Sequence, residues 1–422
     1  MADLRTNFAG IKSPNPFWLA SGPPTDKAYN VERAFAAGWG GVVWKTVGDP
    51  IINVSSRYGA NDYNGTRLAG FTNIELISDR PIEVNLREAK EVKKKWPDRA
   101  VIVSLMVPCE EPAWQSILKQ VEETGCDGIE LNFGCPHGMS ERGMGAAVGQ
   151  VPEYVTMVTK WCKTHSRMPV IVKLTPNVND ILYPAQAAVD GNCDAVSLIN
   201  TVASVIGVNL DTMSPLPEVN GKGSHGGYCG PAVRPIALRM IGDIAREIGP
   251  GLPISGIGGI SNWHDAAEHI AMGAGSVQVC TAAMHQGFKI VEDMIDGLSN
   301  WMDSKGYRTI EDFRGKAVPN YMRWENLDMN YEIKARIDQD ACIKCGLCHI
   351  ACEDTAHQAI TATRENGTRK YEVVDRECVG CNLCMLVCPV ENCITMERID
   401  NGKPYTPWTE DPRNPANKIA AE

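Results

Sequence analysis

The chain has 422 residues, too many for one ordinary domain, with 44% hydrophobic residues and a formal net charge of −10 at pH 7, so it can bury a sizeable core. It has no basic block, which argues against a nucleic-acid partner. No apolar run approaches the about 20 residues that cross a bilayer, and the first residues lack the apolar region of a signal peptide, so we expect no membrane partner.

From the N-terminus to about residue 318, short apolar runs alternate with longer amphipathic stretches. The runs that predict strands are 17–20, 41–45, 100–105, 128–132, 169–174, 195–199, 253–255 and 276–279. Predicted helices between them include 112–124, 152–164, 181–190, 235–248 and 263–272. This alternation predicts a parallel sheet, and its repeats over residues 1–318 favour an α/β fold of the (β/α)8 TIM barrel type. A doubly wound sheet is the alternative, but no early GxGxxG supports it.

The remaining residues divide into three predicted parts. Residues 319–335 are a connector, 336–400 form a small α+β domain with a central hairpin near 361–377, and 401–422 form an extended tail rich in proline. Proline removes a backbone donor and fixes φ, so the tail cannot be helical before its last residues.

Cysteines dominate the domain at 336–400, where a CxxCxxCxxxC run occurs twice. This is the spacing of a bacterial ferredoxin with two clusters, in which the fourth cysteine of each run ligates the other cluster. We therefore assign one [4Fe–4S] cluster to Cys342, Cys345, Cys348 and Cys388, and the second to Cys378, Cys381, Cys384 and Cys352. Zinc would prefer ligands in pairs, and a disulfide framework is the other alternative. Labile clusters predict a reducing, cytoplasmic location.

Polar residues follow the predicted barrel strands. They are Ser21, Lys45, Asn132, Lys173, Asn200 and Thr201. The carboxyl ends of barrel strands form the catalytic face of this fold. Strand ends also carry polar residues because they meet solvent, but lysine after two separate apolar runs is harder to explain in that way. The segments 49–73 and 209–230 are rich in turn residues and predict long loops over this face.

A glycine-rich turn, 255–260, follows one predicted strand, and Cys280 and Thr281 follow the next. Loops after the seventh and eighth strands form the usual phosphate site of a barrel, although a tight turn is the simpler explanation of the glycines. A cofactor that carries one phosphate and converts hydride into single electrons is FMN. Lys45 or Lys173 would supply the positive charge that its reduced ring needs.

Cys135 lies in a segment rich in glycine and methionine that follows the strand ending at Asn132. A thiol on a loop beside a flavin suits a general acid, whereas most free cysteines are small buried hydrophobes. Asn73, Asn132 and Asn200 carry amides that both donate and accept. Paired amides match the alternating C=O and N–H edge of a pyrimidine imide, although each could be a turn residue or a cap.

At these residues the sequence resembles the PreA-type subunits of bacterial dihydropyrimidine dehydrogenases. The motifs are Asn73-Ile-Glu75-Leu-Ile, Asn132-Phe-Gly-Cys135-Pro-His-Gly-Met, Val172-Lys173-Leu-Thr-Pro-Asn177 and Ile199-Asn200-Thr201. The resemblance covers nearly the whole chain and implies an FMN barrel fused to a two-cluster ferredoxin-like domain. The implied reaction is reduction of the 5,6 double bond of uracil or thymine to the 5,6-dihydropyrimidine.

The resemblance also implies roles for individual residues. Cys135 would donate a proton to pyrimidine C5. The implied substrate contacts are Asn73, Glu75, Asn132, Asn200 and Thr201. The implied FMN contacts are Ala20, Lys45, Thr46, Lys173, Gly230, Gly258, Gly259, Cys280 and Thr281. Gly134 stands where the animal enzymes have serine, so one hydroxyl contact is missing.

The sequence shows no βαβ unit with a dinucleotide fingerprint, so electrons need another source. The resemblance implies a PreT-type iron–sulfur subunit that binds FAD and NAD(P)H, and a homodimer within a heterotetramer. Two alternatives stay open. One is a flavoenzyme like dihydroorotate dehydrogenase, which would need a basic group for the orotate carboxylate. The other is an electron-transfer protein whose barrel is a non-catalytic scaffold.

Overall fold

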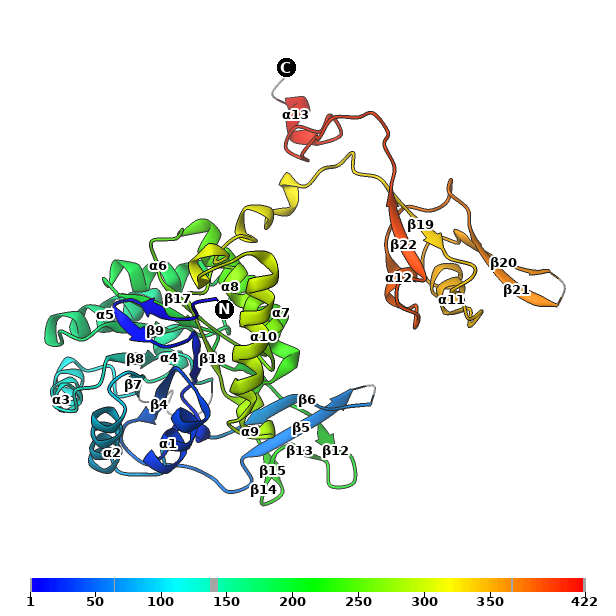
Figure 1. Cartoon of the computed structure of the whole chain (residues 1–422). Helices are drawn as coiled ribbons and strands as arrows, with labels where there is room; N and C mark the ends of the chain where they lie inside the picture. The colour runs from blue at the N-terminus through cyan, green and yellow to red at the C-terminus, as the bar shows by residue number, and fades with distance from the viewer. Residues whose placement is uncertain (1, 64, 137–142, 366, 420–422) are drawn as a thin grey trace. The chain divides into compact units, whose positions relative to one another are not determined.

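A computed structural model of the chain describes residues 2–63, 65–136, 143–365 and 367–419 (Figure 1). The chain forms two compact units, Met1–Tyr321 and Met322–Glu422. The division falls inside the predicted connector. None of the helices in the described ranges is long and apolar enough to cross a membrane.

The first unit is a closed barrel of eight parallel strands, which confirms the predicted TIM barrel. Its strands are β3 (Phe17–Leu19), β4 (Gly41–Val47), β7 (Ala100–Leu105), β8 (Gly128–Asn132), β9 (Val170–Lys173), β10 (Ala195–Leu198), β17 (Ile254–Ile257) and β18 (Ser276–Val279). Each corresponds to one predicted run. Strand β18 pairs with β3, and this pairing closes the barrel.

Helices surround the strands (Figure 1). The longer ones are α1 (Ala28–Ala37), α2 (Ile82–Lys95), α3 (Glu111–Glu122), α5 (Pro152–His165), α6 (Leu182–Asp190), α7 (Arg234–Glu247), α8 (Trp263–Ala271) and α10 (Ile290–Lys305), and the shorter ones are α4 (Ala146–Gly149) and α9 (Thr281–Gln286). Proline in the first turn begins α3, α5 and α7, where its missing N–H costs no helical hydrogen bond. Asn262 caps α8 by accepting from Asp265 N at 3.0 Å.

Alternation along each strand separates two surfaces, because successive side chains point to opposite faces. Val42 and Trp44 belong to the core between strands and helices. Val43 belongs instead to an apolar cluster inside the barrel. That inner cluster is composed of Phe8, Ile11, Trp18, Val43, Ala100, Ile102, Ile171 and Ala195. Toward the ends of the strands the inner face becomes polar. Lys45 is two residues after Val43, and Lys173 is two residues after Ile171.

The N-terminal hairpin supplies the floor of this inner cluster. Strands β1 (Thr6–Phe8) and β2 (Ile11–Ser13) pair antiparallel, and Phe8 meets Trp18 edge to face with ring centroids 5.5 Å apart. The Trp18 indole Nε1 donates to Ser13 Oγ at 3.0 Å. The barrel is therefore apolar and filled at this end and polar at the other.

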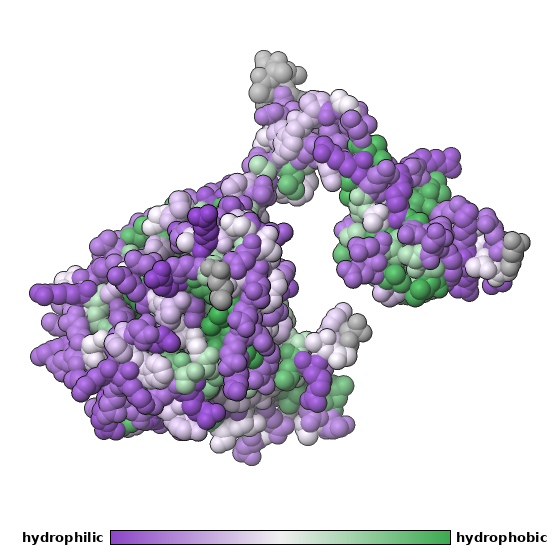
Figure 2. Space-filling view, in the orientation of Figure 1, coloured by the Kyte–Doolittle hydropathy of each residue, from purple (hydrophilic) through white to green (hydrophobic). Residues whose placement is uncertain are grey.

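The two segments predicted as long loops contain strands, so the loop prediction was incomplete. Strands β11 (Val202–Ser204), β16 (Gly226–Cys229), β6 (Thr66–Asn73) and β5 (Tyr58–Tyr63) form an antiparallel sheet in that order. The segment between β11 and β16 adds β12 (Val208–Asn209), β13 (Ser214–Pro215), β14 (Glu218–Val219) and β15 (Lys222–Gly223). Figure 2 shows apolar residues near β12 and β13, where Val208, Leu210 and Met213 are exposed. Partly exposed strands lack a regular apolar alternation, which hid them in the sequence.

The second unit contains two antiparallel strand pairs and short helices. Strand β19 (Ile333–Ile337) pairs with β22 (Ile394–Arg398), and β20 (Ile360–Glu365) pairs with β21 (Thr368–Val373) as the predicted hairpin. Helix α11 (Leu347–Glu353) carries Cys348 and Cys352 of the first run, and helix α12 (Leu383–Leu386) carries Cys384 of the second. The tail, which ends in α13 (Pro415–Ile419), folds back on the connector, where Trp408 lies 6.3 Å from Trp324 between ring centroids.

Trp18→Ala tests the role of the floor. Trp18 is completely buried, so we expect a loss of about 3–5 kcal/mol in the free energy of unfolding, the usual cost of truncating a buried aromatic. Thermal unfolding followed by circular dichroism measures it. The control is Trp324→Ala, which removes an indole that is 62% exposed. An equally small loss in both variants would contradict the assigned floor.

Candidate active site

A cavity with about 1100 Å³ of empty space, part of it open to solvent, lies where the barrel strands end. Its lining includes every barrel residue predicted for the site: Ala20, Lys45, Thr46, Asn73, Glu75, Asn132, Cys135, Lys173, Asn200, Thr201, Gly230, Gly258, Gly259, Cys280 and Thr281. The structure therefore brings all of them together. Their individual roles stay predictions.

A buried ion pair joins Lys45 at the end of β4 to Glu75 after β6. Lys45 Nζ donates to Glu75 Oε1 at 2.6 Å, and both side chains are less than one-tenth exposed. Arg57 Nη1 donates to the same oxygen at 3.1 Å, and the Tyr58 hydroxyl donates to Oε2 at 2.7 Å. Burial and then the bond to Glu75 raise the pKa of Tyr58. The sequence analysis missed Arg57 and Tyr58, since they lie in a segment interpreted as a loop.

The predicted amides form a connected set. Asn132 Nδ2 donates to Thr46 Oγ1 at 2.9 Å, and Asn200 Nδ2 donates to Asn132 Oδ1 at 3.0 Å. Asn200 Oδ1 accepts from Thr201 N at 2.8 Å. Asn73 lies at the end of β6, in the antiparallel sheet β11-β16-β6-β5, which is called the mouth sheet below, and donates to Gly227 O at 3.3 Å. These bonds fix the amide planes. Asn132 Oδ1 is filled, since it also accepts from Gly134 N at 3.2 Å, but each amide nitrogen keeps one hydrogen for a ligand.

Gly134 shows why serine is absent between Asn132 and Cys135. A Cβ atom at Gly134 would lie 2.4 Å from Asn200 Cβ and 2.6 Å from Asn200 Nδ2. A serine would therefore force Asn200 away from its bond to Asn132. In this chain Asn200 fills the space that the hydroxyl would need.

Cys135 lies at the wall of the cavity and is 9% exposed. It packs in a small cluster with Ile77, Met106 and Met144, and its carbonyl oxygen accepts from Ala146 N at 3.1 Å. The thiol is thus both packed and adjacent to the cavity. His137, Met139 and Arg142, which follow it in the predicted motif, lie outside the described residues.

The opposite side of the cavity fits a phosphate. Gly258 and Gly259 have φ values of 123° and 75°, which favour glycine. A Cβ atom at Gly259 would lie 2.5 Å from Arg234 Cβ, so the turn can approach α7 only without a side chain. Helix α9 begins at Thr281, directly after Cys280, whose pKa burial raises to about 12. With Lys45 and Lys173 in the same cavity, the donors fit a phosphorylated flavin.

The cysteines of the second unit are predicted to form two groups of four, and this partition stays a prediction. A separate cavity of about 360 Å³ is lined by Cys352, Cys378, Cys381 and Cys384. Burial, followed by the charges of Cys342, Cys345 and Cys388, raises the pKa of Cys348, which is compatible with a second group of Cys342, Cys345, Cys348 and Cys388. Each group joins three cysteines of one run to the fourth of the other. This arrangement fits crossed ligation.

Cys393 is a ninth cysteine near the first group, and the sequence analysis did not single it out. It is 2% exposed, and burial followed by the charges of Cys388 and Cys342 raises its pKa. Its Sγ atom lies 3.7 Å from Asp338 O, to which the thiol donates. Cysteine at this position falls outside the repeated run, so spacing alone could not identify it.

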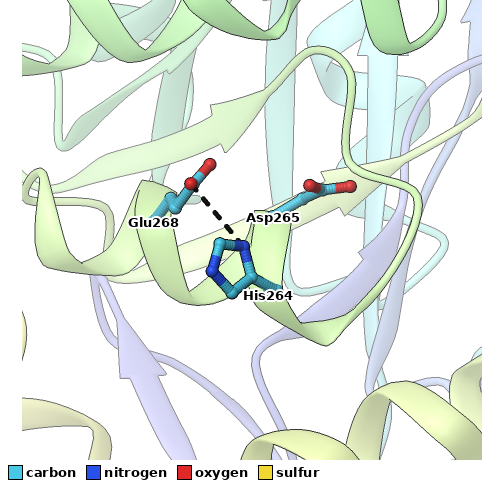
Figure 3. Close-up of side chains that lie close together, drawn as sticks. All are labelled: His264, Asp265 and Glu268. Carbon is cyan, nitrogen blue, oxygen red and sulfur yellow. Dashed lines mark ion pairs between the residues drawn. The ribbon is translucent and has the colours of Figure 1, made fainter. Parts of the chain in front are cut away.

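Three side chains at the start of α8, His264, Asp265 and Glu268, lie close enough together to suggest a metal site (Figure 3). The contacts favour a structural role. Asp265 pairs with Arg234 and accepts from Ser261 N at 2.8 Å. Glu268 lies 3.5 Å from Arg234 Nε and 3.6 Å from His264 Nδ1. The Arg234 guanidinium already gives these two carboxylates the positive charge that a metal ion would provide.

Comparison with known proteins identifies both units. Residues 3–302 match the dihydroorotate dehydrogenase family and residues 335–396 match the 4Fe-4S dicluster domain family. The NAD-dependent dihydropyrimidine dehydrogenase subunit PreA of Escherichia coli K12 is 41% identical over 401 residues, which cover 94% of this chain and 96% of that protein. The chain belongs to the PreA-type dihydropyrimidine dehydrogenase family. Family membership implies FMN in the barrel and two 4Fe–4S clusters in the second unit.

Two further relatives match a smaller share of the chain. The chloroplastic dihydropyrimidine dehydrogenase (NADP(+)) of Arabidopsis thaliana is 41% identical over 357 residues, covering 82% of this chain and 83% of that protein. The catalytic subunit of dihydroorotate dehydrogenase B (NAD(+)) from Pyrococcus abyssi is 35% identical over 316 residues, covering 75% of this chain and 99% of that protein. The PreA-type match therefore extends over more of the chain.

Tyr58→Phe tests the Glu75 network. The raised pKa means that the Tyr58 phenol stays neutral in the folded protein above pH 10, where unfolded tyrosine ionises. We expect an alkaline ultraviolet titration of the wild type to contain a late tyrosine step that Tyr58→Phe removes. The phenol's contribution to stability should be present below about pH 10 and fall as the pH rises further.

Glu75→Gln should lower the pH of the late tyrosine step only part of the way toward 10, since burial is the larger cause of the raised Tyr58 pKa. Titration curves that coincide for wild type and Tyr58→Phe would contradict the assigned contact.

Proposed function

We propose that the chain reduces the 5,6 double bond of uracil or thymine to the 5,6-dihydropyrimidine. The observation that carries this proposal is that Cys135 and the amides of Asn73, Asn132 and Asn200 line one cavity. An acid and a set of imide-reading groups are what pyrimidine reduction needs. The match to dihydropyrimidine dehydrogenases over nearly the whole chain supports the same substrate class.

The substrate would lie against the amides. Asn132 and Asn200 share one hydrogen bond at 3.0 Å, and each keeps one Nδ2 hydrogen that can donate to a C=O group of the imide. Asn73, Glu75 and Thr201 would hold the rest of the ring. A site with fixed polar partners rejects rings that leave those partners unpaired.

FMN would occupy the part of the cavity that is lined by the two lysines and the glycine-rich turn. Its proposed contacts are Ala20, Lys45, Thr46, Lys173, Gly230, Gly258, Gly259, Cys280 and Thr281. Reduced FMN supplies a hydride when it is bound. Cys135 gives its S–H proton to C5, so hydride and proton together add two hydrogens across the double bond. Solvent must then return a proton to the Cys135 thiolate.

The clusters would deliver single electrons to the barrel. One is held by Cys342, Cys345, Cys348 and Cys388 and the other by Cys352, Cys378, Cys381 and Cys384, as proposed above. The Escherichia coli relative is named as a subunit, which supports a partner chain here. We assign that role to a PreT-type subunit that binds FAD and NAD(P)H, in a heterotetramer around a PreA-type homodimer. A cytoplasmic location stays a prediction.

A dihydroorotate-type substrate is the second candidate, because the barrel matches that family. Orotate carries a carboxylate and needs a free cation. Among the described lining residues, Lys45 and Lys173 are the cations, and Lys45 is paired with Glu75 at 2.6 Å. Lys173 is proposed to contact FMN, so neither lysine is left free for a substrate carboxylate. This electrostatic environment favours the neutral pyrimidine.

Uracil reduction by the isolated chain, with dithionite and a mediator as reductant, tests the proposal directly. We expect turnover by the wild type and a loss on the order of 10²-fold or more in kcat for Cys135→Ala, the usual effect of removing a positioned general acid. Cys109→Ala, a partly exposed thiol that does not line the cavity, is the matched control. Full activity in Cys135→Ala would contradict the acid role. No turnover by a fully loaded chain would support the scaffold alternative.

Cys352→Ser tests crossed ligation. Cys352 precedes the second run but lines its cavity, so we expect the cluster held by Cys378, Cys381 and Cys384 to be lost or weakened while the other is retained. Iron analysis should show about half of the wild-type iron. Cys393→Ser, which removes a thiol outside both groups, should retain all of it. Loss of the other cluster in Cys352→Ser would overturn the partition.

A further inference from the structure

Glu130 is a charged residue inside the barrel that the proposed mechanism does not use. Its side chain is completely buried. Oε2 accepts from Ser197 Oγ at 2.9 Å. Oε1 has no hydrogen-bond partner among the described residues. A buried carboxylate with one unpartnered oxygen is unfavourable unless a cation compensates it.

Lys173 is that cation. Its Nζ atom lies 3.6 Å from Glu130 Oε1. Strand register explains the approach: in the parallel pairing, Lys173 lies opposite Asn132 on β8 and opposite Ser197 on β10. Glu130 is two residues before Asn132 and points to the same inner face. The carboxylate is thus one layer deeper than the cavity wall that Lys173 lines.

The two buried lysine–carboxylate pairs of the barrel differ in kind. Lys45 and Glu75 form a 2.6 Å hydrogen bond, and Arg57 adds a second positive charge to the same carboxylate. Lys173 and Glu130 are separated by 3.6 Å, which exceeds a good hydrogen bond. The Lys173 ammonium therefore keeps its donors for a ligand in the cavity, while Glu130 offsets part of its charge from below.

We propose that Glu130 is a positioning residue that tunes the flavin through Lys173. It holds the ammonium at the cavity and limits the positive charge that the ring experiences. Positive charge near the flavin stabilises the reduced anion and raises the reduction potential. Glu130 therefore keeps the potential low, so that the bound flavin is a stronger hydride donor. The inference rests on the FMN site of the proposed function.

Glu130→Gln tests this inference, because glutamine keeps the shape and can still accept from Ser197. We expect the FMN midpoint potential of the anaerobic holoenzyme to rise, measured by spectroelectrochemical titration of the flavin band. A tenfold gain in preference for reduced over oxidised FMN corresponds to about 30 mV for a two-electron couple. Glu130→Asp keeps the negative charge, but its shorter side chain moves the carboxylate away from Lys173. The FMN potential of this variant should lie between those of the wild type and Glu130→Gln.

Asp243→Asn is the matched control. Asp243 is a mostly buried carboxylate on α7 that pairs with Arg239 and Arg246 and does not line the cavity. Its neutralisation removes the same charge and should leave the potential unchanged. In a Lys173→Met background, Glu130→Gln should have a smaller effect on the potential, since the part of its action that passes through the ammonium is removed.

The outcomes separate this inference from the proposed function. A wild-type chain that binds no FMN would overturn both. Bound FMN with the same or a lower potential in Glu130→Gln would overturn the tuning role alone, and would show Glu130 to be a neutral structural acid. An equal rise in the Lys173→Met background would overturn the route through Lys173. None of these readouts depends on which substrate is turned over.

Discussion

Burial of charge at one end of a closed barrel is the constraint that organises the first unit. Closure brings the carboxyl ends of eight strands to one rim, and lysines end two of the predicted runs there. Each ammonium lies in a site less than one-tenth exposed, where an unpaired charge is costly. Each lysine has a carboxylate beside it. Glu75 follows the mouth sheet and pairs with Lys45, and Glu130 lies in the barrel interior beside Lys173.

The same constraint explains why the mouth sheet matters for the site. Glu75 can reach Lys45 because β6 pairs with both β5 and β16 and fixes the segment that follows it. Asn73 is held on the same sheet by Gly227. The substrate-facing groups therefore come from two sources, the barrel strands and the sheet that extends from them. A change in the sheet should affect substrate binding without unfolding the barrel.

Local patterns in the sequence were sufficient to predict the barrel strands and the two-cluster domain. Strands buried on both sides appear as continuous apolar runs, and cluster ligands recur at fixed spacing. The rest depends on contacts distant in sequence. The roles of Arg57 and Tyr58 follow from their hydrogen bonds to Glu75. The role of Glu130 follows from its approach to Lys173. Neither contact could be predicted from the sequence. The strands at the cavity mouth were missed because they are partly exposed and lack a regular apolar alternation, even where the pairing is local, as between β5 and β6.

Substrate choice is the central claim, and NADH oxidation by the chain with a candidate FAD-binding partner subunit tests it most directly. The assay compares uracil with orotate under anaerobic conditions, with and without the partner. The account predicts oxidation with uracil, only when the partner is present, and none with orotate. Turnover of orotate but not uracil would contradict it and would make the chain a dihydroorotate-type enzyme.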